Sequence, residues 1–226
     1  MSLRRLLRKA HLLLRRTPRS ARDVVPDYAE YLRLQREEYL SHESEVPRWV
    51  EGQRRFVEEV FASLPRTSRV LDCGCGDGVG LEALRRLGFQ RLAGVELSGR
   101  KAGRARALGF PVEERDMHDL TVLGEGTFDA VLCSHSLEHA HDAARVLGEI
   151  HRLLATSGLL HLVLPYPDPG PRNERAHAAK YELGTHVADG GDTVARFIVR
   201  QGFEVVVRRQ DDFREPELWI VARRVG

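Results

Sequence analysis

The fold of this 226-residue chain is decided by the stretch Val70-Leu71-Asp72-Cys73-Gly74-Cys75-Gly76-Asp77-Gly78-Val79-Gly80. It begins as an apolar strand that ends in an acid, continues through closely spaced glycines and opens a helix. Glycine has no Cβ and accepts positive φ, so such a turn lets the backbone approach a ligand closely. The helix that follows begins with unpaired N–H groups. The stretch therefore predicts a strand–turn–helix unit that binds a nucleotide-like cofactor.

The spacing of these glycines excludes two common phosphate-binding turns. The dinucleotide pattern Gly-x-Gly-x-x-Gly fails because its third glycine would fall on Val79 or Leu81, and the Gly-Lys-Ser/Thr of a P-loop does not occur. What remains is Asp-x-Gly-x-Gly-x-Gly, and an acid at that point suits a ligand with a positive amino group. Here the chain resembles the class I S-adenosylmethionine (SAM) methyltransferases. The resemblance implies that the methionine part of SAM is bound by Asp72, Gly74, Cys75, Gly76 and Gly78.

The resemblance continues over roughly residues 50–224 and implies further cofactor contacts. Glu96, at the end of a predicted strand and followed by Leu97, would bind the ribose hydroxyls, although dinucleotide folds place an acid at a similar distance. Asp116 and Met117 would contact the adenine; alternatively, Asp116 only caps a turn with Asp119. Ser134, after the fourth predicted strand, completes the set.

Strands and helices alternate along the chain, which favours a parallel sheet covered on both faces. The predicted strands are 69–73, 91–96, 111–115, 128–133, 159–164, 203–209 and 216–224, and the predicted helices are 48–63, 78–87, 98–108, 141–154 and 191–201. The resemblance implies a Rossmann-like seven-stranded sheet of order 3-2-1-4-5-7-6 with the last strand antiparallel. We expect Trp49 and Trp219 to be core aromatics.

Histidines dominate the candidates for acceptor chemistry. An oxygen acceptor usually loses its proton to a base, most often a histidine. His186, in the predicted acceptor lid 165–190, and His135, at the end of the fourth strand, are the two candidates, and His177 lies on the same lid. The sequence Pro165-Tyr166-Pro167 lacks the preceding Asn or Asp that the family's nucleobase and amide N-methylators carry, because Leu164 stands there.

A metal site is an alternative reading of the same region. His135, Glu138 and His139 could share a helical turn and hold a divalent ion. The run His135-Ser136-Leu137-Glu138-His139 is similar to the His-x-Leu-Glu-His run of the branch that contains the ubiquinone-pathway O-methyltransferases, and the resemblance implies that some of these relatives hold a metal there. Those relatives, however, have an acid where this chain has His135. We expect SAM as the cofactor, adenosylhomocysteine as the product and no metal, with Glu138 paired locally and His139 packed under the cofactor loop.

The N-terminal region has a charge pattern of its own. Residues 1–22 carry eight basic and no acidic side chains, with leucines at helical spacing, and predict a basic amphipathic helix. It could pack on the domain or on a second subunit of a homodimer, lie on an anionic membrane through residues 1–20, or attract RNA. We divide the chain into this helix and a helical cap over 1–47, and a methyltransferase domain over 48–226.

Composition indicates an ordinary soluble protein. Hydrophobic content is 42% and charged content 30%, and the three cysteines do not form a disulfide framework, so we expect a reducing cytoplasm. The sequence predicts a SAM-dependent methyltransferase that acts on oxygen of a small natural product, sugar or quinone-like molecule. One alternative is a methyltransferase that acts on lipid-linked or polysaccharide substrates at a membrane surface. A less favoured alternative is an RNA methyltransferase.

Overall fold

A single mixed sheet organises the molecule. The computed structural model describes residues 19–37, 43–170 and 173–226. The seven strands have the order β3-β2-β1-β4-β5-β7-β6, and β7 runs antiparallel to both neighbours. Their bounds are β1 Arg69–Cys73, β2 Arg91–Glu96, β3 Val112–Glu114, β4 Phe128–Ser134, β5 Leu154–Pro165, β6 Phe203–Asp211 and β7 Glu217–Arg224. The predicted Rossmann-like topology is confirmed.

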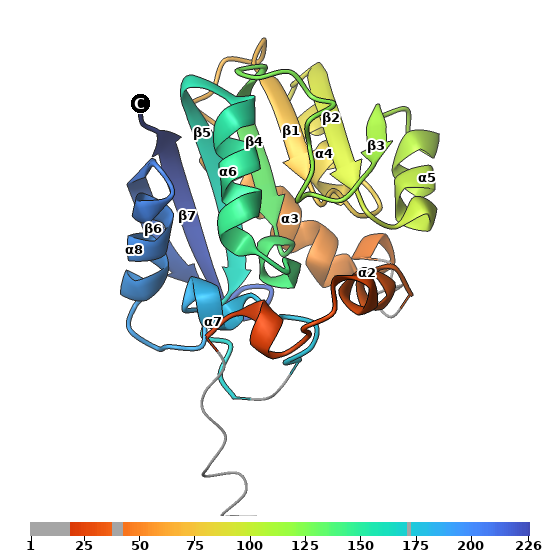
Figure 1. Ribbon diagram of the computed structural model, residues 1–226. Helices are drawn as coiled ribbons and strands as arrows, with labels where there is room; N and C mark the ends of the chain where they lie inside the picture. Colours follow the sequence, from red (N-terminus) through yellow and green to blue (C-terminus); the bar gives the residue numbers. More distant parts are fainter. Residues whose placement is uncertain (1–18, 38–42, 171–172) are drawn as a thin grey trace, which may run out of the picture.

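Helices cover both faces of the sheet (Figure 1). Helices α3, α4 and α5 lie on one face, and α6 and α8 lie on the other. The helices are α2 Tyr28–Glu37, α3 Pro47–Val60, α4 Val79–Arg86, α5 Gly99–Ala107, α6 Ala143–Leu153, α7 Lys180–Leu183 and α8 Asp192–Arg200, with 3-10 turns η1 Ala21–Asp23, η2 Glu43–Glu45 and η3 Leu137–His139.

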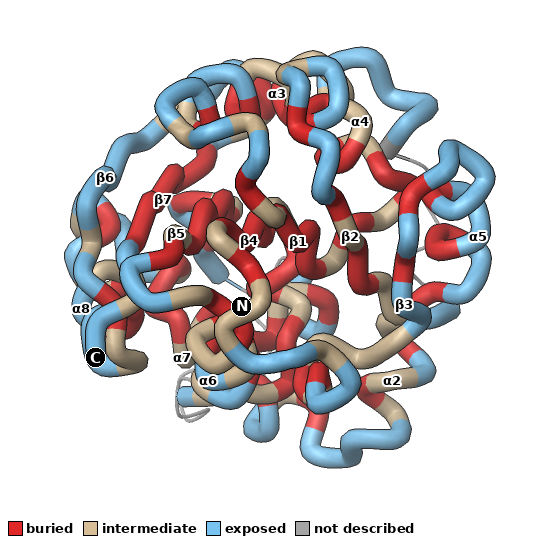
Figure 2. The backbone as a smooth tube through the Cα atoms, turned by 90° about the horizontal axis from the view of Figure 1, so that it is seen from above, coloured by how far each residue is buried: buried red, intermediate tan, exposed pale blue. Residues whose placement is uncertain are grey.

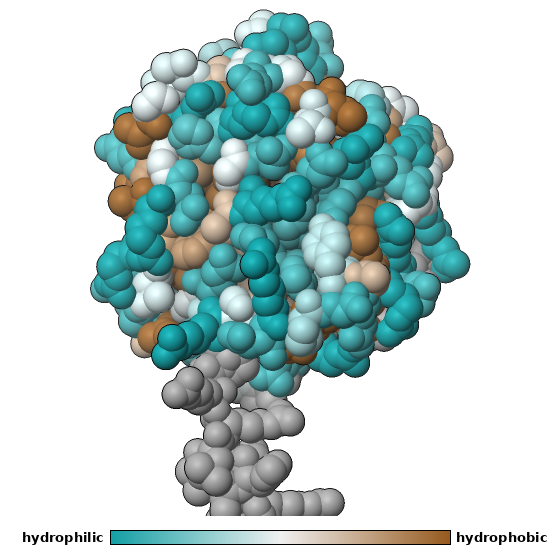
Figure 3. All heavy atoms as spheres, viewed as in Figure 1, coloured by the Kyte–Doolittle hydropathy of each residue, from teal (hydrophilic) through white to brown (hydrophobic). Residues whose placement is uncertain are grey.

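The apolar patterns of the strands explain this layering. The central strands are buried on both faces, as runs such as Val131-Leu132-Cys133 in β4 require. In Figure 2 the buried residues occupy the middle of the molecule and exposed residues surround them. Trp219, in β7, is a core aromatic as predicted. On the outer face that Figure 3 shows, apolar residues are scattered among polar ones.

One strand differs from its prediction. The expected strand 159–164 begins five residues earlier, at Leu154. Phe128 pairs with Leu154 and Ala130 with Leu159, so the residues between them form an irregularity within the strand. Ser157 has a φ of 63°, a left-handed conformation that is typical of such a bulge. Ser157-Gly158, which the predicted strand left out, therefore lies inside β5.

Residues 19–37 lie at the edge where the parallel strands end. In Figure 1, α2 lies below the sheet. Arg22 forms an ion pair of 2.6 Å with Asp142, and the ring of His141 donates a hydrogen bond of 2.9 Å to the Val25 carbonyl. The predicted amphipathic helix falls largely on residues 1–18, outside the described residues. Among the described helices, none combines the length and apolar composition needed to cross a bilayer.

Candidate active site

A cavity of about 440 Å³ opens at the carboxyl ends of β1, β2 and β4, where ligands bind in open α/β sheets. Its wall is completed by α2, α3 and the segment before α7. The predicted cofactor residues that line it are Asp72, Gly74, Cys75, Gly76, Glu96, Leu97, Asp116, Met117 and Ser134. The sequence motifs are thus brought together in one place.

The glycine turn after β1 has the strained backbone that its sequence predicts. Gly74, Gly76 and Gly78 all have positive φ, between 52° and 90°. A Cβ on Gly74 would stand 2.4 Å from Cβ of Ser136, so only glycine fits at this position of the turn. Gly78 does not line the cavity. It stands at the N-cap of α4, and its Cα faces Ala105 of α5, so its role is to let two helices approach.

Two carboxylates end neighbouring strands and face the cavity. Glu96 accepts hydrogen bonds from the backbone N–H groups of Gly76 (2.9 Å) and Ser98 (2.8 Å), which fix its orientation. Asp72 is 3% exposed. Burial, together with the charge of Glu96, raises the pKa of Asp72 to about 8. A positive ammonium of a ligand would stabilise the ionised form of Asp72, and a pair of ligand hydroxyls could donate hydrogen bonds to Glu96. SAM has both groups.

Asp116 lies at the cavity wall with both oxygens engaged. It accepts hydrogen bonds from Nδ1 of His118 at 2.6 Å and from the hydroxyl of Tyr28. Burial opposes its ionisation, but these bonds outweigh burial and lower the pKa of Asp116 to about 2. Its Oδ1 also accepts from the His118 backbone N–H at 3.0 Å, which is the turn cap considered as the alternative. A contact with adenine remains a prediction.

A buried polar network supports Ser134. The Ser134 hydroxyl donates to Oε1 of Gln53 at 2.7 Å, and Arg214 donates to the same oxygen at 3.2 Å. Arg214 in turn pairs with Glu217 at 2.6 Å, and the indole of Trp219 donates to Glu217 at 2.9 Å. This polar part of the cavity wall is thereby fixed by residues from α3, from β7 and from the loop before β7 that no motif had marked.

His135 lies in the cavity wall among three carboxylates. Its ring nitrogens lie 3.5 Å from Glu138, 3.5 Å from Glu215 and 3.4 Å from Glu217. Burial lowers the pKa of His135, but Glu138 and Glu217 outweigh burial, so the net shift is upward. Trp49 packs edge-on against the ring at 4.8 Å. Trp49 thus lines the cavity rather than the core in which it was expected.

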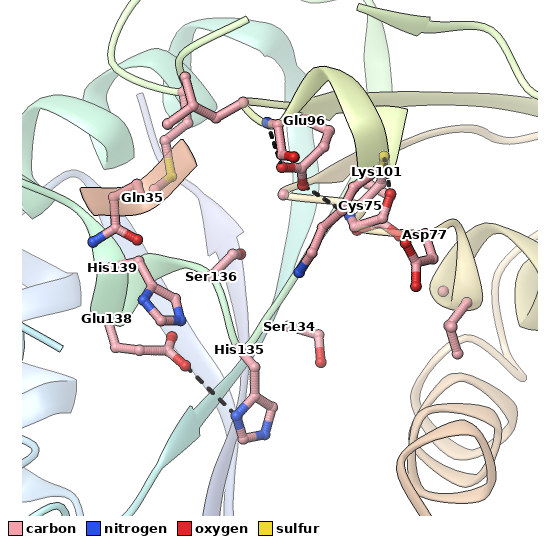
Figure 4. Close-up of a pocket in the computed structure, with 18 of the residues that line it drawn as sticks. Gln35, Cys75, Asp77, Glu96, Lys101, Ser134, His135, Ser136, Glu138 and His139 are labelled. Carbon is pink, nitrogen blue, oxygen red and sulfur yellow. Dashed lines mark hydrogen bonds and ion pairs between the residues drawn. The ribbon is translucent and has the colours of Figure 1, made fainter. Parts of the chain in front are cut away.

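Three potential ligand atoms, from Glu138, His139 and His177, lie within 4.8 Å of one another. Among the described residues, Oε2 of Glu138 is buried without a hydrogen-bond partner. Burial lowers the pKa of His139 to about 4. In Figure 4, Glu138 and His139 lie across the cavity from Glu96. Two imidazoles and a carboxylate are a donor set that divalent ions accept. The predicted set was His135, Glu138 and His139; in the structure the third member of the cluster is His177 instead of His135.

His186, the other predicted base, lies outside the cavity lining. Its Nδ1 donates to the Lys180 carbonyl at 3.0 Å, and its ring rests on Tyr181 at 5.1 Å. His177 lines the cavity instead, together with Asn173 of the same segment. The sequence marked the segment but not which of its histidines turns inward, because that depends on how the segment folds back on the sheet.

Comparison with known proteins agrees with this geometry. Residues 42–207 match the model of a family described as methyltransferase domain. The chain belongs to this family. Its sheet order, its glycine turn and its paired acids are those of the class I enzymes, and SAM is the cofactor that these residues fit.

The curated relatives match only part of the chain. Ubiquinone biosynthesis O-methyltransferase of Xanthomonas axonopodis pv. citri is 38% identical over 113 residues, which is 47% of each chain. The same-named protein of Xanthomonas oryzae pv. oryzae is 37% identical over 101 residues, 42% of each chain. The matches thus span about half the length of these curated relatives.

Among solved structures, the SAM-dependent methyltransferase of Mesorhizobium loti has a TM-score of 0.59 at 22% identity, over 77% of this chain and 100% of that one. The [4+2]-cyclase SpnF has a TM-score of 0.62 at 18% identity, over 79% and 82%. These likenesses show the fold alone. A cyclase with the same fold makes clear that the reaction must be argued from the site.

Proposed function

We propose that this SAM-dependent methyltransferase transfers a methyl group to an oxygen atom of a small molecule. The observation that carries the proposal is one cavity with Asp72 and Glu96 at one end and an imidazole–carboxylate cluster at the other. The names of the 38% identical relatives support oxygen as the acceptor atom. Leu164 before Pro165 adds support, since the resemblance links an Asn or Asp there to N-methylation.

The residues divide the work between two ends of the cavity. When bound, SAM supplies an electron-poor methyl group that an acceptor oxygen can attack. Asp72 would hold its ammonium and Glu96 its ribose hydroxyls, with Glu96 already oriented by two backbone N–H groups. At the other end, His135, Glu138 and His177 offer hydrogen bonds to a hydroxyl-rich acceptor, which suits a sugar, a polyphenol or another polar natural product. Orientation of this kind is a main source of rate in such transfers.

Calorimetric titration with SAM and adenosylhomocysteine tests the cofactor end. We expect binding by the wild-type protein, at least tenfold weaker binding by Asp72→Ala and by Glu96→Ala, and unchanged binding by the control Glu113→Ala, an exposed acid on β3. Equal binding by all four proteins would refute the assignment.

Transfer of labelled methyl from SAM tests the acceptor end. A panel of 3,4-dihydroxybenzoate, quercetin, rhamnose and, as a nitrogen acceptor, histamine separates the classes. We expect label on oxygen of at least one hydroxyl compound. Label on nitrogen alone, or on no compound while SAM binds, contradicts the proposal.

The basic N-terminal sequence supports a second candidate, a methyltransferase that acts on lipid-linked or polysaccharide substrates at a membrane surface. Eight basic and no acidic residues within 1–22 would attract anionic lipid. Co-sedimentation with vesicles of phosphatidylglycerol, lost on deletion of residues 1–20, is the expected result. Binding of tRNA that survives this deletion would favour RNA, and a dimer lost with it would favour a subunit contact. The free thiols of Cys73, Cys75 and Cys133 suit a cytoplasmic enzyme.

A further inference from the structure

We propose that His177, held by Asp168, is the general base that takes the proton from the acceptor hydroxyl. This inference rests on the proposed oxygen methylation. It gives the role of base to a residue that the sequence placed only on the lid, and it starts from the hydrogen bond of 2.8 Å between Nδ1 of His177 and Oδ2 of Asp168.

Asp168 is built to hold one tautomer of that imidazole. It is 8% exposed, and its Oδ1 lies 3.5 Å from Nζ of Lys180. Lys180 is completely buried and also donates to the Gly170 carbonyl at 2.8 Å. The carboxylate, paired with this ammonium, can only accept a hydrogen bond. Nδ1 of His177 therefore carries the hydrogen, and Nε2 keeps the lone pair that a base requires.

The segment that carries His177 is fixed against the cavity. The His177 backbone N–H donates to the Asn173 carbonyl at 2.7 Å, and the Ala179 N–H donates to the carbonyl of Glu138 at 3.2 Å. Gln35 of α2 donates to the Ala176 carbonyl at 3.4 Å. The imidazole is thus placed at the acceptor end by contacts on both sides, in the same cavity as Asp72.

The other histidines near this end are less suited to the task. His135 is surrounded by three carboxylates, which favour its protonated form. His139 packs edge-on against His177 at 5.0 Å, and its Nδ1 donates to the Ala176 carbonyl. His186 lies outside the cavity lining. His177, in contrast, lines the cavity and holds the carboxylate of Asp168 at 2.8 Å on Nδ1.

The step balances without a further reactant. The acceptor O–H bond breaks and its proton passes to Nε2 of His177, while an O–CH₃ bond forms and the electron pair of the S–CH₃ bond stays on sulfur. The resulting imidazolium is stabilised by Asp168 and by Glu138, whose carboxylate faces the same space. The proton then leaves to water, because His177 keeps 15% of its side chain exposed.

The tautomer can be read without any acceptor. In full-length protein labelled with ¹⁵N in its histidines, we expect the ring signals of His177, assigned through His177→Gln, to show the hydrogen on Nδ1 at pH 8. Asp168→Asn should shift them toward the Nε2–H form, because an amide can donate to Nδ1. A wild-type ring with its hydrogen on Nε2 overturns the proposal even if SAM binds and oxygen is methylated.

Turnover gives the second readout, with whichever hydroxyl compound of the panel wild-type enzyme methylates. We expect His177→Gln to lower kcat about 10²–10⁴-fold with the SAM Kd unchanged. The residual rate of this variant should rise with pH, because the acceptor hydroxyl must then lose its proton to solvent. The titratable groups that face the His177 ring are Asp168, Glu138 and His139. The matched control His151→Gln, whose ring lies against the Val225 carbonyl and Phe203 and does not line the cavity, should keep wild-type kcat.

Three outcomes overturn the assignment. The first is wild-type kcat in His177→Gln. The second is a loss of rate at low acceptor that disappears at saturating acceptor, which is an effect on KM alone. The third is activity that a chelator abolishes and Mn²⁺ restores, which would make His177 a metal ligand. If wild-type enzyme binds SAM but methylates no oxygen acceptor, the proposed function fails and this inference falls with it.

Discussion

The hydroxyl of Tyr28 donates a hydrogen bond to the carboxylate of Asp116, which joins residues 88 positions apart. Tyr28 is in the first turn of α2, and Asp116 follows β3 at the cavity wall. The phenol ring also packs edge-on against His118 at 5.8 Å and His141 at 5.1 Å. Tyr31 and Gln35 of the same helix line the cavity. The hydrogen bond from Tyr28 to Asp116 therefore holds α2 in place as one wall of the cavity.

Removing that hydroxyl should loosen the wall. We expect Tyr28→Phe to lower the free energy of unfolding by about 1–2 kcal/mol, because Asp116 loses one donor while it stays ionised. Urea unfolding at pH 7 measures the change. Tyr181→Phe is the matched control, since its hydroxyl donates to Glu174 only seven residues away. A loss no larger in Tyr28→Phe than in the control would contradict the fastening role.

Binding of SAM should release a proton from Asp72. With a pKa raised to about 8 by burial and by Glu96, Asp72 is largely protonated at pH 7 in the free protein. A bound ammonium favours the ionised form, so the proton must leave on binding. Calorimetry at pH 7 in phosphate and in Tris should give enthalpies that differ by up to one proton's ionisation heat, and the difference should vanish above pH 9. In Asp72→Asn it should be absent at both pH values; a difference that persists there assigns the proton to another group.

The sequence was sufficient for the half of the site that follows directly from strand ends. Asp72 and Glu96 could be placed because each ends a recognisable strand, and neighbouring parallel strands bring their carboxyl ends to one edge. The same logic placed His135 in the cavity. Gly78 carried the same motif signal, but its positive φ serves the N-cap of α4, so a motif position is not by itself a ligand contact.

The other half depends on packing that no local pattern encodes. Tyr31 and Trp49 reach the cavity from helices whose rotation is set by the whole interface, and Trp49 reads equally well as a core residue. The sequence favoured His186 over His177 as the base. Only the folding of the segment around buried Lys180 places His177 at the cavity and His186 away from it. The bulge at Ser157 was not predicted, because a Ser-Gly pair is also typical of a turn between elements.

Substituting Gly74 should damage both fold and cofactor binding. Its φ is +83°, and an added Cβ would stand 2.4 Å from Cβ of Ser136. We expect Gly74→Ala to cost at least about 2 kcal/mol in unfolding free energy and to weaken SAM binding at least tenfold. Gly103→Ala is the control, because a Cβ on that residue of α5 meets nothing within 4 Å; it should stabilise by about 0.5–1 kcal/mol. Chemical unfolding and calorimetry of both variants decide, and equal stabilities would show that the turn tolerates a side chain.

His161 should make the protein sensitive to acid. It is completely buried in β5 and stacks on Phe61 at 3.9 Å, and within the described part of the chain neither ring nitrogen has a hydrogen-bond partner. Burial lowers its pKa from 6.5 to about 3. Between these values the unfolded chain binds a proton that the native protein does not, so stability falls as the pH drops below 6.5.

Replacing this histidine with leucine should remove that dependence. We expect His161→Leu to be more stable than wild type by about 1 kcal/mol at pH 7.5, because an unpaired polar group leaves the core. The advantage should grow by about 2 kcal/mol at pH 5, where the unfolded wild-type chain is protonated. Urea unfolding at both pH values measures it, with the outlying His151→Leu as control. An advantage that does not change with pH would mean that the buried imidazole finds a proton partner in solution, and the acid sensitivity must then come from other residues.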